Sequence, residues 1–462
     1  MTGDVIIGVD AGTSVIKAVA FDLSGRQVAS ESRRNTYQPV PGGGVEQNMA
    51  RTWTDTAAVL SALVAKLKPI QAAPVALAVT GQGDGTWLID AAGKPVGDAW
   101  LWLDARAVAE ARALEASAGI DLIYKATGTG VNVCQMRTHL NHMKAHTPHR
   151  LKEAATAFHC KDWLYFNLTG VRATDPTEGV FTFGNMATRD YDEDVIAALG
   201  LSGERSLMPP IVDGAVTAHG LTPEAASATE LPSGLPVMLG YVDVMCSSMG
   251  AGLHDSESKP GLTLLGSTGM HMRFVDDASA VVLNEDRGGY TMAFPGNAFA
   301  QIQTNMAATL NIDWVVEMAR AVLQTADVER DHGAILADLD GPVLDAKPGA
   351  AMFHPYISSA GERGPFAEPD ARASFTGLDQ NTGWFDMVRA VYDGLALAAR
   401  DCYAAMGPVP GEIRLSGGAA RSKAIRTILA ASLGAPVRTV NQAESGAAGA
   451  AMIAAVQLGI HR

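Results

Sequence analysis

Apolar residues along the first 110 positions alternate between two spacings, one typical of buried strands and one typical of amphipathic helices. The strand-like runs predict four strands, at residues 4–10, 15–23, 75–80 and 86–89. Between the second and the third strand, the segment Asn48 to Leu67 places its apolar residues at helical spacing. This alternation predicts an α/β fold in which helices cover a sheet.

The second half of the chain repeats this order after a mainly helical stretch at 105–170. A buried strand is predicted from Leu235 to Tyr241, and a helix of small residues from Cys246 to Leu253. Beyond them we expect strands at 261–275 and 413–415, a loop at 354–372, and helices at 305–323, 383–406, 421–433 and 444–458. A domain boundary is therefore predicted near residue 246, between a domain at 1–246 and a domain at 247–462.

Each half also carries a glycine-bearing turn directly after a strand. The first turn is Gly12-Thr13-Ser14 and the second is Gly266-Ser267-Thr268. Free backbone N–H groups in such turns form a concavity that suits an anion such as phosphate. Taken alone, the first turn is equally consistent with an ordinary hairpin in which Gly12 adopts a positive φ. Two copies indicate a duplicated fold that holds one polyphosphate from both sides, and hence an enzyme that uses ATP.

Composition narrows the class of protein. The chain has 462 residues, of which 47% are apolar and 18% charged, so a globular protein of two or three domains is expected. Its four cysteines form no C-x-x-C pair, its start lacks a basic signal-peptide region, and no apolar run is long enough to span a bilayer. We therefore expect a cytoplasmic enzyme with reduced cysteines.

The acidic balance limits the choice of partners. A net charge of −14 argues against nucleic acid or an anionic membrane as the main partner. Bound phosphate must then be held by local N–H groups, a few side chains and Mg²⁺. The histidines His139, His142, His271 and His354 have no matching ligands at metal-binding spacing, so we expect packing or surface roles for them.

Two aspartates follow predicted strands and are candidates for the chemistry. Asp10 stands at a strand end, where its carboxylate could hold Mg²⁺ through water. Asp243 follows the strand that ends at Tyr241, which is a suitable place for a general base. The alternative for Asp243 is an N-cap on the following helix, and the two roles are compatible.

Further polar residues are candidates for ligand binding. Gln82, Gly83 and Asp84 lie among glycines that allow close approach to a polyhydroxylated ligand, although a plain turn is the alternative. Asp104 and Arg106 are expected to form a structural salt bridge. Gly417-Gly418-Ala419 follows a predicted strand, where the backbone can lie flat against a nucleobase or a ribose.

Together these segments resemble the FGGY family of carbohydrate kinases over the whole length of the chain. The most specific match is the C-terminal signature, which this sequence fits from Ala373 to Leu378 and from Asp386 to Asp393. The other matching motifs are Asp10-x-Gly12-Thr13-Ser14, Trp102-x-Asp104-x-Arg106, Lys161-Asp162-Trp163-Leu164, Leu168-Thr169-Gly170, Thr174-Asp175, Gly361-Glu362-Arg363-x-Pro365, Ser416-Gly417-Gly418-Ala419, and Glu444 with Gly449-Ala450-Ala451.

The resemblance implies two duplicated actin-like (ribonuclease H-like) ATPase domains that flank a central cleft. It implies ATP-dependent phosphorylation of a terminal hydroxyl, with Mg²⁺ held near Asp10 and Asp243 as the catalytic base. The two turns and Gly417-Gly418-Ala419 would bind ATP. Gln82, Gly83, Asp84, Asp104 and Asp243 would contact the sugar.

The sequence says less about the substrate and the oligomeric state than about the type of reaction. The segment Gln82-Gly83-Asp84 differs from the Gln-Arg-Glu of glycerol kinases and from the Gln-Met-His of many xylulose kinases. We expect a polyol or ketose of four or five carbons, similar to erythritol or xylulose, and the sequence leaves a homodimer open. The alternatives are a non-catalytic ATP-driven switch and a sugar-sensing pseudokinase of the same fold. An intact Asp10 and Asp243 argue against the pseudokinase.

Overall fold

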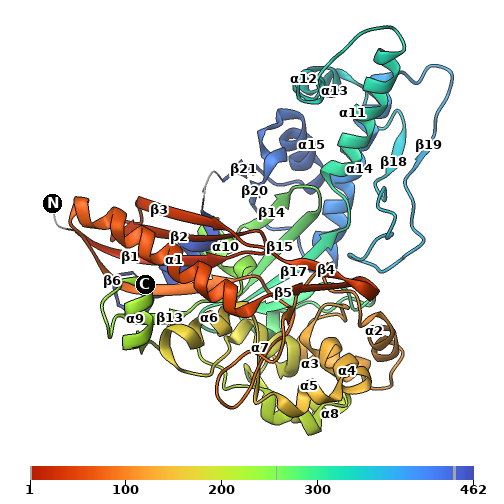
Figure 1. Cartoon of the computed structure of the whole chain (residues 1–462). Helices are drawn as coiled ribbons and strands as arrows, with labels where there is room; N and C mark the ends of the chain where they lie inside the picture. The colour runs from red at the N-terminus through yellow and green to blue at the C-terminus, as the bar shows by residue number, and fades with distance from the viewer. Residues whose placement is uncertain (1–2, 256, 441–443, 462) are drawn as a thin grey trace.

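The computed structural model describes residues 3–255, 257–440 and 444–461, and two six-stranded sheets organise the chain (Figure 1). The first sheet has the order β12-β13-β6-β1-β2-β3, with the bounds β1 (Gly3–Ala11), β2 (Val15–Asp22), β3 (Gln27–Arg34), β6 (Ala72–Gly81), β12 (His219–Gly220) and β13 (Pro236–Leu239). The second has the order β16-β17-β15-β14-β20-β21, with the bounds β14 (Gly261–Leu265), β15 (Gly269–Val275), β16 (Tyr290–Ala293), β17 (Phe299–Asn305), β20 (Ile413–Ser416) and β21 (Val437–Thr439).

The two sheets repeat one topology. In the first, β1, β2 and β3 form an antiparallel meander, and β6 and β13 continue the sheet in parallel on the other side of β1. In the second, β14, β15 and β17 form the meander, and β20 and β21 continue in parallel beside β14. The extra strands, β12 and β16, are added antiparallel at opposite edges. This confirms the predicted duplicated α/β fold.

Helices bury both faces of the first sheet. The outer face packs against α1 (Met49–Leu67), α6 (Cys160–Thr169) and α9 (Pro223–Thr229). Successive residues of a strand point to opposite faces, so Val5, Ile7 and Val9 enter this outer core while Ile6 enters the core on the inner face. Burial on both faces explains why β1 is an almost continuous apolar run.

Two small-residue helices, α10 (Asp243–Gly250) and α16 (Ser445–Gln457), pack against each other and against the inner face of the first sheet. Their apolar cluster also contains residues of the second sheet, so it joins the two halves of the molecule. Glycine makes the close approach possible, because a Cβ at Gly449 of α16 would collide with the carbonyl group of Cys246 in α10. The predicted boundary at residue 246 falls inside α10, and as a domain limit it stays a prediction.

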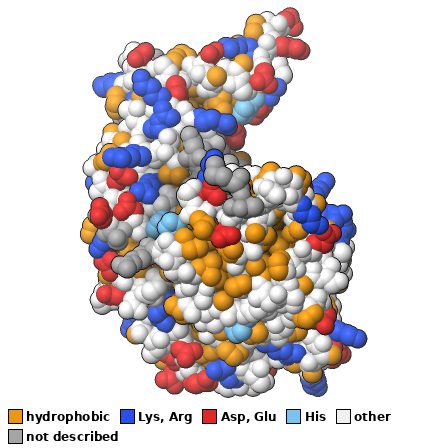
Figure 2. Space-filling model, turned by 90° about the vertical axis from the view of Figure 1, so that its left-hand side faces the viewer, with side chains coloured by type: hydrophobic (Ala, Val, Ile, Leu, Met, Phe, Trp, Pro, Cys, Tyr) orange, Lys and Arg blue, Asp and Glu red, His pale blue; other side chains and the backbone are white. Residues whose placement is uncertain are grey.

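The outer face of the second sheet is covered mainly by α14 (Trp384–Ala405), α15 (Lys423–Leu433) and α11 (Thr309–Gln324). The smaller helices α12 (His332–Asp338) and α13 (Asp340–Asp345) extend this layer at the top of Figure 1. The strands β18 (Met352–His354) and β19 (Ser374–Thr376) pair antiparallel on either side of the loop predicted at 354–372. Figure 2 shows a notch between this upper part and the lower body of the molecule.

A helical lobe at the bottom right of Figure 1 is inserted between β8 and β12 of the first half. It has an apolar core of its own. Its helices are α2 (Val108–Glu115), α3 (Ile120–Thr127), α4 (Met136–His146), α5 (Pro148–Glu153), α7 (Pro176–Phe183) and α8 (Glu193–Ala198). The remaining short strands are β4 (Gln38–Val40), β5 (Gly44–Gln47), β7 (Trp87–Ile89), β8 (Ala99–Trp100), β9 (Thr156–Phe158), β10 (Gly184–Asn185) and β11 (Asp190–Tyr191).

Candidate active site

The first predicted phosphate turn, Gly12-Thr13-Ser14, joins β1 to β2 and is held by side chains. The Thr13 hydroxyl accepts a hydrogen bond from the Trp102 indole N–H (2.8 Å) and donates one to Gln82 Oε1 (3.0 Å). Gly12 does not adopt the positive φ that a glycine would allow at this turn. The turn is therefore fixed by hydrogen bonding to the segment that was predicted to contact the sugar.

The hydrogen bonds continue from Gln82 back to the turn. Gln82 Nε2 donates to Gln47 Oε1 (2.7 Å), and Gln47 Nε2 donates to Asn35 Oδ1 (2.6 Å). Asn35 Nδ2 then donates to the carbonyl oxygen of Gly12 (2.9 Å). Gln82 is buried, and each end of its amide already has a protein partner. Because an amide nitrogen carries two donors and its oxygen two lone pairs, Gln82 retains capacity for one further contact at each end.

The second turn, Gly266-Ser267-Thr268, joins β14 to β15 and is exposed. The carbonyl oxygens of Ser267 and Gly266 accept hydrogen bonds from the backbone N–H groups of Ala308 and Thr309, at the start of α11. A Cβ added at Gly266 would meet nothing within 4 Å. The turn is therefore anchored on one side and open on the other, as an anion-binding turn requires.

The segment Gly417-Gly418-Ala419 follows β20, the parallel neighbour of β14. Gly417 has a φ of 95° and lies against the backbone of Leu265, so a side chain is excluded there. The Cβ position of Gly418 faces open space, while Ala419 is buried. The end of β14 therefore lies next to an open stretch of backbone, which suits the flat face of a nucleobase or a ribose.

Asp10, Asp84 and Asp243 form a carboxylate cluster at the ends of strands in the first half. Asp10 is the next-to-last residue of β1, and Asp243 is the first residue of α10 after β13. Burial raises the pKa of Asp243 to about 7, and the negative charges of Asp10 and Asp84 raise it as well. Burial also raises the pKa of Asp10 to about 6, although Lys17 lowers it. The negative charges of these carboxylates repel one another, and burial removes the water that would solvate them. A bound cation would reduce both penalties.

Asp243 does not cap α10. The N-cap residue is Val242, which makes no side-chain cap hydrogen bond, and Asp243 occupies the first helical position. Its Oδ1 accepts a hydrogen bond from the N–H of Val244 (2.7 Å). The N-cap alternative for Asp243 is therefore wrong, and one carboxylate oxygen remains for other chemistry.

Asp84 links the two halves of the molecule. Its Oδ2 accepts a hydrogen bond from the hydroxyl of Tyr290 (3.0 Å), which lies on β16 of the second sheet, while its buried Oδ1 has no hydrogen-bond partner. Burial raises the pKa of Asp84 above its ordinary value. Neighbouring Gly83 packs closely against Val242 and Glu178, so a side chain there would be excluded. Sequence reasoning missed Tyr290, because no motif marks the start of β16.

A buried network of ion pairs supports the part of the protein that holds Asp84. Lys161 Nζ lies 2.7 Å from Asp175 Oδ1 and 3.1 Å from Asp162 Oδ1, and all three side chains are fully buried. Asp175 also caps α7 by accepting hydrogen bonds from the N–H groups of Thr177 and Glu178. This network explains the Lys-Asp and Thr-Asp motifs as a structural support.

Glu178 connects this network to the carboxylate cluster and was missed by the sequence analysis. Its Oε1 accepts a hydrogen bond from the backbone N–H of Asp84 (3.1 Å), and its Oε2 lies 3.2 Å from His159 Nε2 without hydrogen-bond alignment. Burial raises the pKa of Glu178 to about 8. Burial lowers the pKa of His159, but the charge of Glu178 raises it, and the net shift is upward. The available signal was a charged residue directly before the apolar run Gly179 to Phe183.

The sequence matches two descriptions of one family along nearly its whole length. Residues 5–250 match the N-terminal domain of the FGGY family of carbohydrate kinases, and residues 263–458 match its C-terminal domain. This chain belongs to the FGGY family of carbohydrate kinases. It is accordingly a sugar or polyol kinase, a phosphotransferase with an alcohol group as acceptor.

Individual relatives of this FGGY kinase agree with that assignment. An erythritol kinase of Brucella abortus (strain 2308) is 50% identical over 460 residues, which cover 99% of this chain and 88% of that protein. A xylulose kinase of Escherichia coli (strain K12) is 27% identical over 92% of this chain and 84% of that protein. The crystal structure of xylulose kinase from Rhodospirillum rubrum superposes with a TM-score of 0.87 at 26% identity, covering 98% of this chain and 89% of that one.

In this FGGY kinase, Asp104 is engaged by the protein itself. Both of its carboxylate oxygens accept hydrogen bonds from Arg106, and Oδ2 also accepts one from the N–H of Val45 (2.9 Å). Burial raises the pKa of Asp104, whereas the hydrogen bonds from Arg106 lower it, and the net shift is downward. The expected salt bridge is confirmed. A sugar contact by Asp104 stays a prediction.

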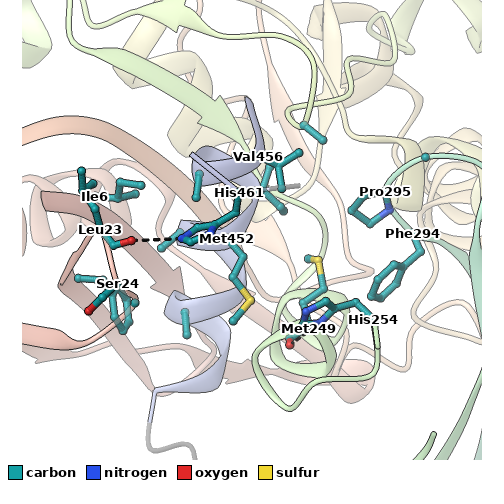
Figure 3. Close-up of a pocket in the computed structure, with 18 of the residues that line it drawn as sticks. Ile6, Leu23, Ser24, Met249, His254, Phe294, Pro295, Met452, Val456 and His461 are labelled. Carbon is teal, nitrogen blue, oxygen red and sulfur yellow. Dashed lines mark hydrogen bonds between the residues drawn. The ribbon is translucent and has the colours of Figure 1, made fainter. Parts of the chain in front are cut away.

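One pocket of the kinase lies apart from these residues. It has a volume of about 620 Å³ and is lined mainly by apolar side chains from α10, α16 and the strands beside them, including Met249, Phe294, Met452 and Val456 (Figure 3). It contains none of the predicted site residues. The pocket therefore does not coincide with the predicted site.

Proposed function

We propose that this kinase transfers the γ-phosphoryl group of ATP to a terminal hydroxyl of a polyol or ketose with four or five carbons, and that erythritol is its preferred acceptor. The carrying observation is the carboxylate cluster. Asp84 offers a buried oxygen without a partner, and Asp243 is the aspartate at the head of α10. The 50% identity to an erythritol kinase supports the choice among polyols.

Asp243 is proposed as the general base. A base is most effective when its pKa lies near the working pH, and burial together with Asp10 brings the pKa of Asp243 to about 7. Its ionised carboxylate would accept the proton of the attacking hydroxyl as the phosphoryl group arrives. Glu178 fixes the backbone N–H of Asp84, and Tyr290 holds its Oδ2. Most of the catalysis is then positioning of the acceptor.

Asp10 is the residue that fits Mg²⁺. Its carboxylate has a buried oxygen, Oδ1, without a hydrogen-bond partner, and hard divalent cations take such oxygen ligands. When bound, Mg²⁺ supplies charge stabilisation to the phosphates of ATP. The turns at Gly12-Thr13-Ser14 and Gly266-Ser267-Thr268 are proposed to donate N–H groups to these phosphates, and the adenosine is placed against Gly417-Gly418-Ala419.

The assignment of a working kinase is favoured over the two alternatives. The matched relatives are kinases by name, which lends no support to an ATP-driven switch or a pseudokinase. Among the helices of the described residues, none is long and apolar enough to cross a membrane. We propose a cytoplasmic enzyme whose partners are ATP and a small polyol, with a homodimer as the assembly to be tested.

The acceptor is tested by ADP release from Mg·ATP with a panel of polyols and ketoses of three to six carbons. We expect the highest kcat/KM with a four-carbon polyol and a lower one with five-carbon ketoses. A preference for glycerol or for a six-carbon sugar would contradict the proposed acceptor. Release of ADP at the same rate without any acceptor would contradict the kinase role of the site.

Asp84→Ala is expected to raise the KM for the polyol by roughly 10–100-fold, because a hydrogen bond to a charged group contributes about 1.5–3 kcal/mol. The KM for ATP should change little. Tyr290→Phe is the matched control, since it removes the partner of Asp84 Oδ2 but keeps the carboxylate. An unchanged KM for the polyol in a folded Asp84→Ala protein would place the sugar elsewhere.

Gly418→Val is expected to raise the KM for ATP while leaving the KM for the polyol unchanged. The added side chain would enter open space in the protein, so the fold should tolerate it, but it would occupy the position proposed for adenosine. Gly411→Val is the control. Gly411 lies before the start of β20, is also exposed, and has open space at its Cβ position. Equal ATP affinity in both variants, measured by calorimetry, would contradict the placement.

A further inference from the structure

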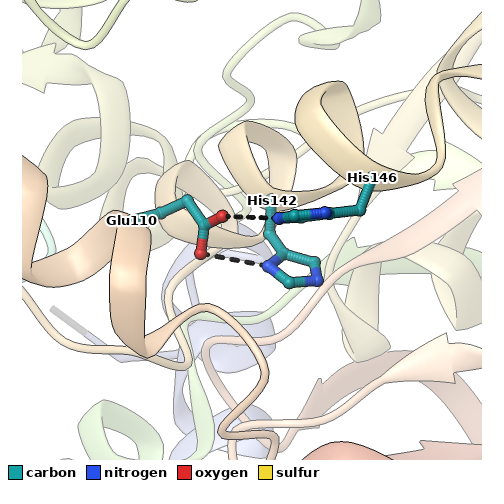
Figure 4. A group of neighbouring side chains, drawn as sticks. All are labelled: Glu110, His142 and His146. Atoms are coloured by element: carbon teal, nitrogen blue, oxygen red, sulfur yellow. Dashed lines mark hydrogen bonds and ion pairs between the residues drawn. The ribbon is translucent and has the colours of Figure 1, made fainter.

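One glutamate and two histidines meet on the helical lobe, and none of them belongs to the carboxylate cluster (Figure 4). His142 and His146 lie four residues apart on α4, so they share one face of the helix. Glu110 reaches them from α2. The sequence-based expectation of packing or surface roles for His139 and His142 overlooked this spacing. In the structure His139 is buried elsewhere, with its Nδ1 beside the hydroxyl of Thr86.

The three ligand atoms have the spacing of a metal site. Glu110 Oε2 lies 3.0 Å from His142 Nδ1, and Glu110 Oε1 lies 3.2 Å from His146 Nε2. Bonds of about 2.0–2.1 Å from Zn²⁺ to nitrogen or oxygen place neighbouring tetrahedral ligands about 3.3 Å apart. One ligand atom from each of the three residues lies within 4.8 Å of the other two. A metal ion could therefore replace the two ion pairs with only small rotations of the side chains.

Burial pre-organises part of this group and leaves part of it open. The side chains of Glu110 and His142 are 16% and 18% exposed, whereas that of His146 is 58% exposed. Burial raises the pKa of Glu110, whereas hydrogen bonds with His142 and His146 lower it, and the net shift is downward. The carboxylate is therefore ionised at neutral pH. Two ligands are held in place, and the exposed side gives access to an ion and to water as a fourth ligand.

We propose that Glu110, His142 and His146 bind a divalent transition-metal ion, with Zn²⁺ as the best fit. Two imidazoles and one carboxylate suit Zn²⁺, Ni²⁺ or Co²⁺, whereas Mg²⁺ and Ca²⁺ prefer sites made of oxygen ligands. The site is thus chemically distinct from the Mg²⁺ site at Asp10. The competing explanation is a pair of partly exposed Glu–His contacts, which contribute little to stability.

Such a site would connect two elements next to the W-x-D-x-R motif. α2 begins two residues after Arg106, and α4 contacts Trp100 through the ring of His142, at 5.7 Å between centroids. The guanidinium of Arg106 lies 3.6 Å from the centre of the same Trp100 ring. A metal ion would cross-link α2 to α4 and stabilise the lobe by mass action, without taking part in phosphoryl transfer.

The test uses the full-length, untagged protein after treatment with EDTA and dialysis. Titration with Co²⁺ is expected to give visible d–d absorption bands at one ion per chain, which added Zn²⁺ abolishes. The melting temperature should rise with Zn²⁺ and not with the same concentration of Mg²⁺. Loss of even outer-shell partners changes metal affinity by about 10–100-fold, so His146→Ala should weaken Co²⁺ binding by at least that factor.

His149→Ala is the matched control, because His149 is an exposed histidine on neighbouring α5. Glu110→Gln gives a second test that preserves the shape of the side chain and removes its charge. It should weaken Co²⁺ binding in the same way as His146→Ala. The proposal is overturned if the wild-type protein takes up no Co²⁺ at stoichiometric concentration. It is also overturned if binding is equally strong in His146→Ala, Glu110→Gln and His149→Ala.

Discussion

Asparagine in place of Asp243 is expected to lower kcat by ~10²–10⁴, which is the usual effect of removing a general base. The KM for ATP should change little, because neither phosphate turn is altered. Asparagine is nearly isosteric with aspartate, and its amide oxygen can still accept the hydrogen bond from Val244. The variant should be at least as stable as the wild type, since it removes a buried charge that Asp10 repels.

Asp243→Ala separates a catalytic role from a structural one. If Asp243 only anchors the start of α10, alanine should lower the melting temperature and leave most of the turnover. If Asp243 is the base, both variants should lose turnover, and the loss in Asp243→Asn should come without a loss of stability. Turnover similar to wild type in Asp243→Asn would contradict the proposed mechanism.

The raised pKa of Asp243 also predicts a pH dependence. The base must be ionised to accept a proton, so kcat/KM for the polyol should fall as the pH drops through a midpoint at or below about 7. Mg²⁺ favours the ionised form, and higher Mg²⁺ should therefore move this midpoint to lower pH. The residual activity of Asp243→Asn should lack this acidic limb. A wild-type profile that is flat between pH 5 and 8 would contradict the assignment.

Lys161→Met is expected to destabilise the kinase by about 3–5 kcal/mol, because removing one partner of a buried ion pair leaves uncompensated charge in the interior. Lys161 Nζ lies within 3.1 Å of both Asp162 and Asp175, and none of the three side chains is exposed. The change should be visible as a lower midpoint of chemical denaturation. Lys161 belongs to the ion-pair network next to Glu178, so its loss should also reduce activity.

Lys68→Met is the control for this effect. Lys68 pairs with Glu230 at 2.8 Å, but both side chains are largely exposed, so its loss should change the denaturation midpoint little. Equal midpoints for Lys161→Met and Lys68→Met would show that the buried network does not hold this part of the fold together.

Strongly periodic elements of this kinase could be predicted from the sequence. The helix expected at Asn48 to Leu67 is α1 at Met49–Leu67, and the one expected at 383–406 is α14 at Trp384–Ala405. By contrast, β3 was missed, because its sequence Gln27–Arg34 is polar and contains no fully buried residue, so it carries no apolar pattern. Its place is set by pairing with β2 rather than by its own residues.

The candidate site residues at the ends of strands could be predicted from the sequence. Asp10, Asp84 and Asp243 meet because β1, β6 and β13 are parallel neighbours whose carboxyl ends lie at one edge of the sheet. Tyr290 and Glu178 were not predictable in this way. Tyr290 comes from the other sheet, and Glu178 from a helix of the inserted lobe, so only tertiary packing brings them to Asp84.

The central claim is that this kinase phosphorylates a terminal hydroxyl of a small polyol. Phosphorus NMR of the product made from Mg·ATP and erythritol tests it most directly. The account predicts one new phosphomonoester signal that is split into a triplet by the two protons of a CH₂ group, formed together with ADP and lost in Asp243→Asn. A doublet from an inner carbon, or inorganic phosphate as the only product, would contradict the account.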